Sequence, residues 1–331
     1  MAVNLFIFNF NLKAINVMKK NAYIHFSIKL ILFLFIVFIL DFTIGGVLRH
    51  YYFTQVSGRQ YRATYAIDKT TDEVVVFGSS RAYHHYVPSI IEDSLHKTCY
   101  NTGSPGQFLL YNYATLLAIL KRYSPKLIIL DVSANDFSMN QESYDRLSFL
   151  LPYYKDHAEI RPIVDLKSSL EKYKLLSSIY AFNSSFLMIA GGNSSYFKKK
   201  SVDLKGYKPL DNIWTQSLET RDFGPYQLDS VKVATFKSFI KDCQHAGTQL
   251  FVVCSPSYIK YLQRDNSISL IEQIAKEYNT PFMDFTNDST FINHKYLFDD
   301  PGHLNAKGAQ LFTSILMNKF NDSMKIKSFT K

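Results

Sequence analysis

Apolar residues gather in one long run near the N-terminus and afterwards in short runs that turn residues separate. The long run is unbroken from Leu30 to Leu40 and continues to Leu48, with Asp41 as its only charged residue. Its length is close to the ~20 residues that a helix needs to cross a bilayer. We therefore expect a transmembrane helix over residues 30–48.

Basic residues precede this run and indicate its orientation. They are Lys13, Lys19, Lys20 and Lys29. Because basic segments stay on the cytoplasmic side, residues 1–29 are expected in the cytoplasm and the folded part on the extracytoplasmic side, periplasmic or outer. A cleaved signal peptide has the same order of basic and apolar residues. The length of the run and the lack of a small-x-small motif after Leu40 favour an uncleaved anchor, for which Met18 is a natural start.

Short apolar runs follow a polar linker at residues 49–72, and each ends at a turn signal. Strands are predicted at residues 73–77, 98–101, 126–132, 249–254 and 281–284. Helical spacing predicts helices near residues 109–120, 230–243 (capped by Asp229 or Ser230), 268–278 and 306–320. Strands that alternate with helices form a mostly parallel sheet covered on both faces, so we expect an α/β domain with three layers, α/β/α, over residues 73–331.

The alternation breaks down between about residues 138 and 224. This segment is rich in Tyr, Ser, Leu and Lys and contains Pro152, Pro162 and Pro209. A connection of this length is usually functional, so a largely helical insertion that acts as a lid or binding subdomain is expected. Residues 166–179 have the pattern of an amphipathic helix.

Composition and charge narrow the function classes. The chain has 331 residues, an apolar fraction of 47% and a formal net charge of +9, which describe a folded basic protein. No basic motif or charged face typical of nucleic-acid binding is present, whereas an anionic membrane surface accounts for the charge. The cysteines Cys99, Cys243 and Cys254 match neither a disulfide framework nor a zinc motif, and Cys99 and Cys254 are expected to be buried thiols.

Residues with catalytic chemistry follow the predicted strands, where ligands of parallel sheets bind. Ser80 follows Gly78 after the first strand, Gly103 follows the second, and Asn135 follows the third. Asp300 and His303 lie near the C-terminus, three residues apart. Taken singly, each is also typical of an ordinary turn or cap.

Taken together, these residues make a complete set for acyl transfer. His303 would remove the Ser80 proton while Asp300 fixes the imidazole tautomer. The backbone N–H groups of Ser80 and Gly103 and the Asn135 amide would stabilise the oxyanion. This chemistry requires no metal and no organic cofactor.

The order of these residues resembles the SGNH (GDSL-type) hydrolase superfamily, whose four sequence blocks carry Ser, Gly, Asn and His. Matching positions are Ser80, Gly103, Asn135 and His303 with Asp300, over about residues 73–320 without the insertion. The resemblance implies a flavodoxin-like sheet. Ser79 replaces the Asp of Gly-Asp-Ser, and Ser133 replaces the Gly of Gly-x-Asn-Asp. With the anchor, the Ser79 variant is similar to membrane-tethered proteins that acylate cell-envelope polymers, including those of teichoic-acid D-alanylation.

Other polar residues near these positions have alternative interpretations. His84 and His85 are expected on the surface or on the pocket wall, and Arg81 either faces solvent or contacts an anionic substrate. Asp299 competes with Asp300 as the triad carboxylate, and the spacing favours Asp300. The remaining acidic candidates, Asp136 and Asp284, are expected to cap loops.

We therefore expect a membrane-anchored serine esterase or O-acyltransferase that acts on acylated envelope glycan or a small ester. The first alternative is a non-catalytic protein of the same fold that binds polysaccharide or a membrane acyltransferase partner. The second is a structural protein that uses its anchor and lid, with a cleft filled by side chains. Retention of Ser80, Asp300 and His303 together favours the enzyme, while the sequence leaves hydrolysis and transfer undecided.

Overall fold

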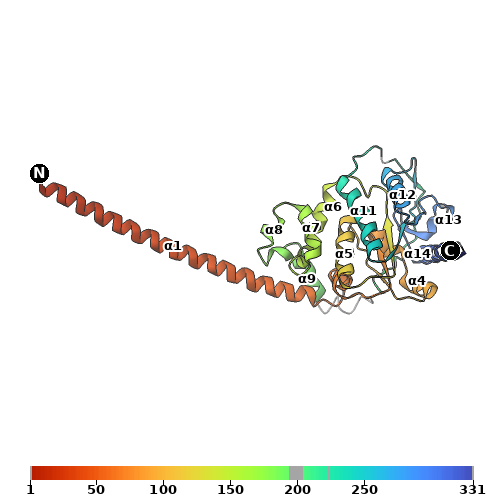
Figure 1. Cartoon of the computed structure of the whole chain (residues 1–331), viewed down its shortest axis with the longest axis horizontal. Helices are drawn as coiled ribbons and strands as arrows, with labels where there is room; N and C mark the ends of the chain where they lie inside the picture. The colour runs from red at the N-terminus through yellow and green to blue at the C-terminus, as the bar shows by residue number, and fades with distance from the viewer. Residues whose placement is uncertain (1, 194–203, 223, 330–331) are drawn as a thin grey trace.

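A computed structural model of the chain describes residues 2–193, 204–222 and 224–329. A long helix, α1 (Ala2–Phe53), extends away from a compact body that contains the rest of these residues (Figure 1). Residues Asn21–Phe53 of α1 have a mean hydropathy of 2.7 over their most apolar window, and almost none of that window is buried. By its length and composition, this helix is able to serve as a membrane anchor or as a signal sequence.

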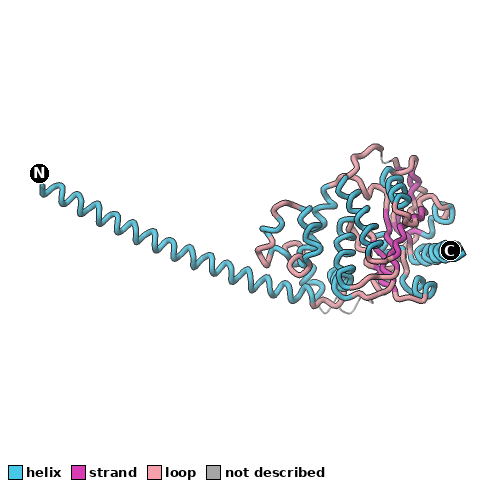
Figure 2. The backbone as a smooth tube through the Cα atoms, viewed as in Figure 1, coloured by secondary structure: helices cyan, strands magenta, loops and turns pink. Residues whose placement is uncertain are grey.

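A five-stranded parallel sheet forms the centre of the body (Figure 2). In spatial order its strands are β2 (Cys99–Asn101), β1 (Val74–Phe77), β3 (Leu127–Val132), β5 (Gln249–Cys254) and β7 (Phe282–Asp284). All the pairings are parallel, which confirms the predicted strands. The chain passes from β1 to one neighbour, β2, and then to the other, β3. The carboxyl end of β1 is therefore a topological switch point, where open α/β sheets bind their ligands.

Helices cover both faces of this sheet, so the predicted three-layer α/β/α arrangement is present. Alternate strand residues such as Val75 and Ile128 pack with one set of helices: α5 (Leu109–Arg122), α11 (Ser230–His245) and α12 (Asn266–Glu277). The strand residues on the opposite face, such as Val76 and Ile129, pack with the other helices: α3 (Ser80–His85), α4 (Pro88–Leu95), α13 (Ser289–Ile292) and α14 (Ala306–Phe329). Of the two predicted caps, Asp229 and not Ser230 caps α11, because its carboxylate accepts hydrogen bonds from the Val231 and Lys232 N–H groups. The three cysteines are buried free thiols.

Smaller elements complete the body outside the central sheet. They are a parallel pair, β4 (Glu219–Arg221) and β6 (Ile259–Tyr261), the one-turn helix η6 (Lys295–Leu297), and an antiparallel pair, β8 (Phe298–Asp300) and β9 (His303–Leu304). Residues 49–72, expected to be a polar linker, are mostly helical: they contain the end of α1, α2 (Gly58–Thr64) and the π-helix η1 (Tyr65–Lys69).

The described part of the insertion consists mainly of short helices, in agreement with the predicted, largely helical insertion. They are α6 (Gln141–Asp145), η2 (Arg146–Tyr153), η3 (Ala158–Ile160), α7 (Arg161–Val164), η4 (Asp165–Lys167), α8 (Glu171–Lys174), η5 (Tyr180–Phe182) and α9 (Phe186–Asn193). The prediction of one amphipathic helix over residues 166–179 was wrong, because turns at Ser168 and Ser177 interrupt it. A third apolar core joins these helices to α5 and to the buried Tyr52 of α1.

Candidate active site

The turn between β1 and α3 places Ser80 at the carboxyl edge of the sheet. Gly78 adopts a φ of +149°, and a Cβ there would lie 2.7 Å from the Ala82 Cβ and 2.9 Å from the Asp131 Cβ. Only glycine fits both the backbone conformation and the space. The tight turn makes Ser80 the first residue of α3, where its side chain is partly exposed.

The β8–β9 pair holds Asp300 opposite His303. The Asp300 carboxylate accepts backbone hydrogen bonds from Gly302 (2.7 Å) and His303 (3.0 Å), which fix the turn. Its Oδ2 also lies 2.9 Å from the His303 Nδ1. The short hairpin therefore sets both the position and the orientation of the imidazole.

Ser80, His303 and Asp300 form one continuous chain of hydrogen bonds. The His303 Nε2 lies 2.7 Å from the Ser80 Oγ, across 223 positions of sequence. Because Nδ1 faces a carboxylate, it carries the ring proton, and Nε2 is then the acceptor for the serine hydroxyl. Partial burial by itself would raise the pKa of Asp300, but the hydrogen bonds from His303 and from the two backbone N–H groups hold that pKa below its usual value.

Gly103 does not present its backbone N–H to the site. That N–H donates to the Asn101 Oδ1 at 2.9 Å. A Cβ at Gly103 would lie 2.4 Å from the Tyr83 nitrogen, so the glycine allows the end of β2 to contact the backbone of α3. In this structure Gly103 allows close packing. Its N–H is bonded to Asn101 and so is not free to act as the expected oxyanion donor.

The two other expected oxyanion donors are the Asn135 side-chain amide and the Ser80 backbone N–H. Asn135 adopts a φ of +63°, and its backbone N–H donates to the Asp265 Oδ1 at 3.2 Å. Its side-chain Oδ1 is buried without a hydrogen-bond partner among the described residues. The Ser80 N–H lies in the first turn of α3, where backbone N–H groups have no partner within the helix.

Both expectations for Arg81 were wrong, because it neither faces solvent nor reaches outward. Its guanidinium is buried and forms an ion pair with Asp131, with 3.5 Å between Nε and Oδ2. It also donates hydrogen bonds to the backbone oxygens of Val132 and Ser255. The network connects the start of α3 to the ends of β3 and β5. Asp131 was missed because, in the sequence, it is one polar residue inside an apolar strand.

The two histidines after Ser80 differ in their environment. His85 was expected at the surface or pocket wall, but it is fully buried: its Nδ1 lies 3.0 Å from the Ser255 Oγ, and its Nε2 accepts the Leu304 N–H at 3.0 Å. It therefore supports the hairpin next to His303. The half-buried His84 lies with its ring 5.5 Å from the His303 ring, and burial lowers the pKa of His84 to about 4.

The other acidic candidates each accept a hydrogen bond from a backbone N–H group. Asp299 accepts a hydrogen bond from the Asn212 N–H at 3.0 Å, and Asp284 accepts one from Thr286 at 2.9 Å. Asp136 accepts two from Ser133, at its N–H (2.8 Å) and its Oγ (2.7 Å), and burial raises the pKa of Asp136 to about 6.

Across residues 2–193, 204–222 and 224–329, no three His, Cys, Asp or Glu side chains are arranged to hold a metal ion. The chain as a whole matches no protein-family model, and no curated protein matches it at a significant level. The geometry of the Ser80 site is therefore the feature of the molecule from which a function is inferred.

Proposed function

We propose that this protein is a membrane-anchored serine esterase or O-acyltransferase of SGNH type, acting on acyl esters of cell-envelope glycan. The observation that carries the proposal is the chain of hydrogen bonds from Ser80 through His303 to Asp300. A serine hydroxyl bonded to an imidazole that a carboxylate orients is the arrangement of an activated nucleophile.

The proposed reaction has two stages. His303 takes the Ser80 proton while Ser80 attacks the ester carbonyl, and the resulting imidazolium is stabilised by Asp300. The Ser80 N–H and the Asn135 amide stabilise the oxyanion, and the alcohol leaves with the proton from His303. Water or a sugar hydroxyl then attacks acyl-Ser80, with His303 again as the base.

The membrane assignment is supported by how α1 joins the body. Tyr52 near its end is buried in the third apolar core, and Asp41 is hydrogen-bonded to the insertion. Signal-peptide cleavage between these residues would remove contacts of the folded protein, which favours a retained anchor.

A fluorophosphonate probe tests the nucleophile. The full-length protein in detergent should be labelled at Ser80, and labelling should disappear in Ser80→Ala. Ser79→Ala is the matched control, because the Ser79 side chain makes no capping hydrogen bond and the residue adjoins the nucleophile. The proposal fails if the wild-type protein stays unlabelled or if the Ser80→Ala protein is labelled equally.

One observation favours a non-catalytic alternative. Because the Gly103 N–H is bonded to Asn101, two of the three expected oxyanion donors remain. A protein that binds polysaccharide or a membrane acyltransferase through the same cleft would not need them. That alternative predicts no probe labelling and unchanged cellular function in Ser80→Ala.

A further inference from the structure

The insertion is fastened to α1 by direct contacts. The Asp41 carboxylate accepts hydrogen bonds from the N–H groups of Ser178 (2.6 Å) and Ile179 (3.2 Å) and from the Ser177 hydroxyl. One turn further along, a Cβ at Gly45 would lie 2.4 Å from the Ser178 Cβ. The insertion and α1 therefore touch closely between Asp41 and Gly45.

These contacts fix the depth of the insertion relative to a membrane. A helix crosses the bilayer with ~20 apolar residues. A span that begins after Lys20 then ends near Leu40, and one that begins after Lys29 ends near Arg49. In the first case Asp41 lies at the boundary of the hydrocarbon layer, and in the second it lies inside. In both cases the insertion residues bonded to Asp41 reach the boundary of the hydrocarbon layer.

Exposed apolar side chains lie in the same segment of the insertion as the residues bonded to Asp41. Leu176, next to Ser177, is 78% exposed, and Leu187 is 88% exposed. They belong to a set that we call the apolar shelf: Leu170, Tyr173, Leu176, Phe186, Leu187 and Met188. α8 lies at the end of the body from which α1 departs (Figure 1). Exposed apolar side chains gathered on one segment indicate a membrane or protein contact.

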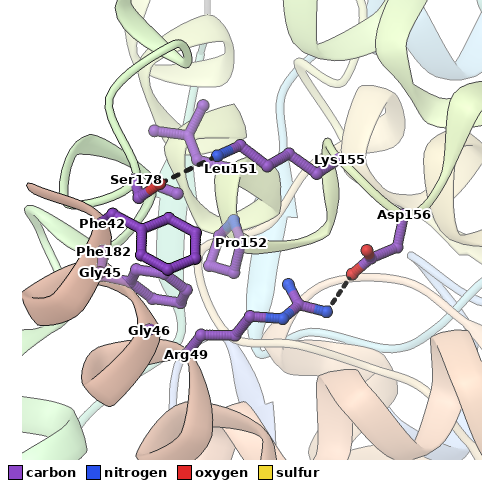
Figure 3. Close-up of a pocket in the computed structure, with 11 residues that line it drawn as sticks. Phe42, Gly45, Gly46, Arg49, Leu151, Pro152, Lys155, Asp156, Ser178 and Phe182 are labelled. Atoms are coloured by element: carbon purple, nitrogen blue, oxygen red, sulfur yellow. Dashed lines mark hydrogen bonds and ion pairs between the residues drawn. The ribbon is translucent and has the colours of Figure 1, made fainter. Parts of the chain in front are cut away.

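A cavity of about 330 Å³ lies between α1 and the insertion (Figure 3). Its walls are largely apolar, from Phe42 of α1 and Pro152 and Phe182 of the insertion. Arg49 and Lys155 also line it, with Arg49 paired to Asp156 and Lys155 donating to the Ser178 hydroxyl. Apolar walls with cations beside them suit an acyl chain below a phosphate headgroup.

We propose that the insertion is a second membrane-contacting element, whose apolar shelf lies among phospholipid acyl chains of the leaflet facing the folded domain. The depth set by Asp41 and the lining of the adjacent cavity favour lipid as the occupant. This inference rests on the proposed membrane anchoring by α1. Two contacts, the helix and the shelf, would hold the Ser80 site at one height and orientation above the bilayer.

Quenching by brominated lipids tests this contact in the full chain, reconstituted in nanodiscs of phosphatidylcholine and phosphatidylglycerol with brominated acyl chains. Leu176→Trp reports on the shelf, and Leu187→Trp is a second reporter in case the first variant fails to fold. Phe35→Trp reports on α1. The matched control is Leu262→Trp, because Leu262 is exposed directly after β6, outside both α1 and the insertion. The native Trp214 gives the same background in each variant.

Loss of most of the fluorescence at positions 176 and 35, with position 262 unaffected, is the expected result. Quenching at position 35 without quenching at positions 176 and 187 would overturn this inference and leave the proposed anchor in place. The shelf would then be assigned to a protein partner. Absence of quenching at 35 would overturn both this inference and the proposed anchor. Equal quenching at 176 and 262 would also contradict it, because the contact would not be confined to the shelf.

Discussion

The Arg81 Nε lies 3.5 Å from the Asp131 Oδ2, and both side chains are buried beneath the turn that carries Ser80. Asp131 also accepts hydrogen bonds from the Tyr86 hydroxyl (2.7 Å) and the Ser255 N–H (3.1 Å). One ion pair thereby joins α3 to β3 and β5. It holds the turn that carries Ser80 in register with the ends of the strands.

Asp131→Asn should destabilise the protein strongly, because it leaves the Arg81 charge buried without a counter-charge. Removing one partner of a buried pair typically costs about 3–5 kcal/mol. Denaturant unfolding in detergent measures the free energy of unfolding. Asp93→Asn, at an exposed carboxylate, should change it by less than ~0.5 kcal/mol. Equal effects of the two substitutions would contradict the structural role of the pair.

His85→Leu should weaken the support of the β8–β9 hairpin, which carries His303. The variant leaves the Leu304 N–H and the Ser255 hydroxyl without their partner, at a cost of about 1–3 kcal/mol for a buried group. Because Leu304 follows His303, we expect slower probe labelling of Ser80 as well as lower stability. His85→Asn, which keeps a polar side chain, should restore part of the labelling rate, and a purely structural role would leave that rate unchanged in the stable fraction.

Asp300→Asn should lower the rate of Ser80 acylation by about 10⁴. An amide at this position removes the carboxylate that fixes the His303 tautomer, while the fold changes little. Single-turnover labelling with an ester or fluorophosphonate measures the rate. Asp299→Asn is the control, since Asp299 bonds to Asn212, and it should label at close to the wild-type rate.

Asp136 should make stability depend on pH in a defined direction. Its pKa is about 6 in the folded protein and about 4 when unfolded, so the folded state binds more protons between these values. The contribution of Asp136 to the free energy of unfolding should therefore fall as the pH rises from 4 to 6, by up to ~3 kcal/mol. Asp136→Asn should remove this decrease. The prediction would be contradicted if the free energies of unfolding of the two proteins changed equally with pH across this range.

Gly45→Ala should separate the insertion from α1, because its Cβ would lie 2.4 Å from the Ser178 Cβ and 2.7 Å from the Ser178 carbonyl carbon. Overpacking of this kind costs about 1–3 kcal/mol. Gly46→Ala is the matched control, since a Cβ there meets nothing within 4 Å. Faster tryptic cleavage at Lys172 and Lys174 in the first variant alone is expected, and equal cleavage in both would contradict the contact.

Most of the α/β framework follows from the sequence, because local patterns carry it. Five strands and the helices α5, α11, α12 and α14 are predicted by apolar runs, helical spacing and caps such as Asp229, whereas α3 and α4, between β1 and β2, are not. The insertion is less predictable. Of residues 166–179, only Leu175 joins the third apolar core, whereas Leu170, Tyr173 and Leu176 are exposed. The amphipathic pattern of this segment therefore does not correspond to one helix packed on the body.

For the site, the sequence by itself determined which candidate residues are present: a serine after a buried strand and an Asp-x-x-His segment near the C-terminus. Tertiary structure decided which groups meet. It joined Ser80 to His303 across 223 positions and buried Arg81 and His85. The physical reason is that spacing along the chain constrains local conformation only, whereas hydrogen-bond partners depend on which strand ends are neighbours in the sheet.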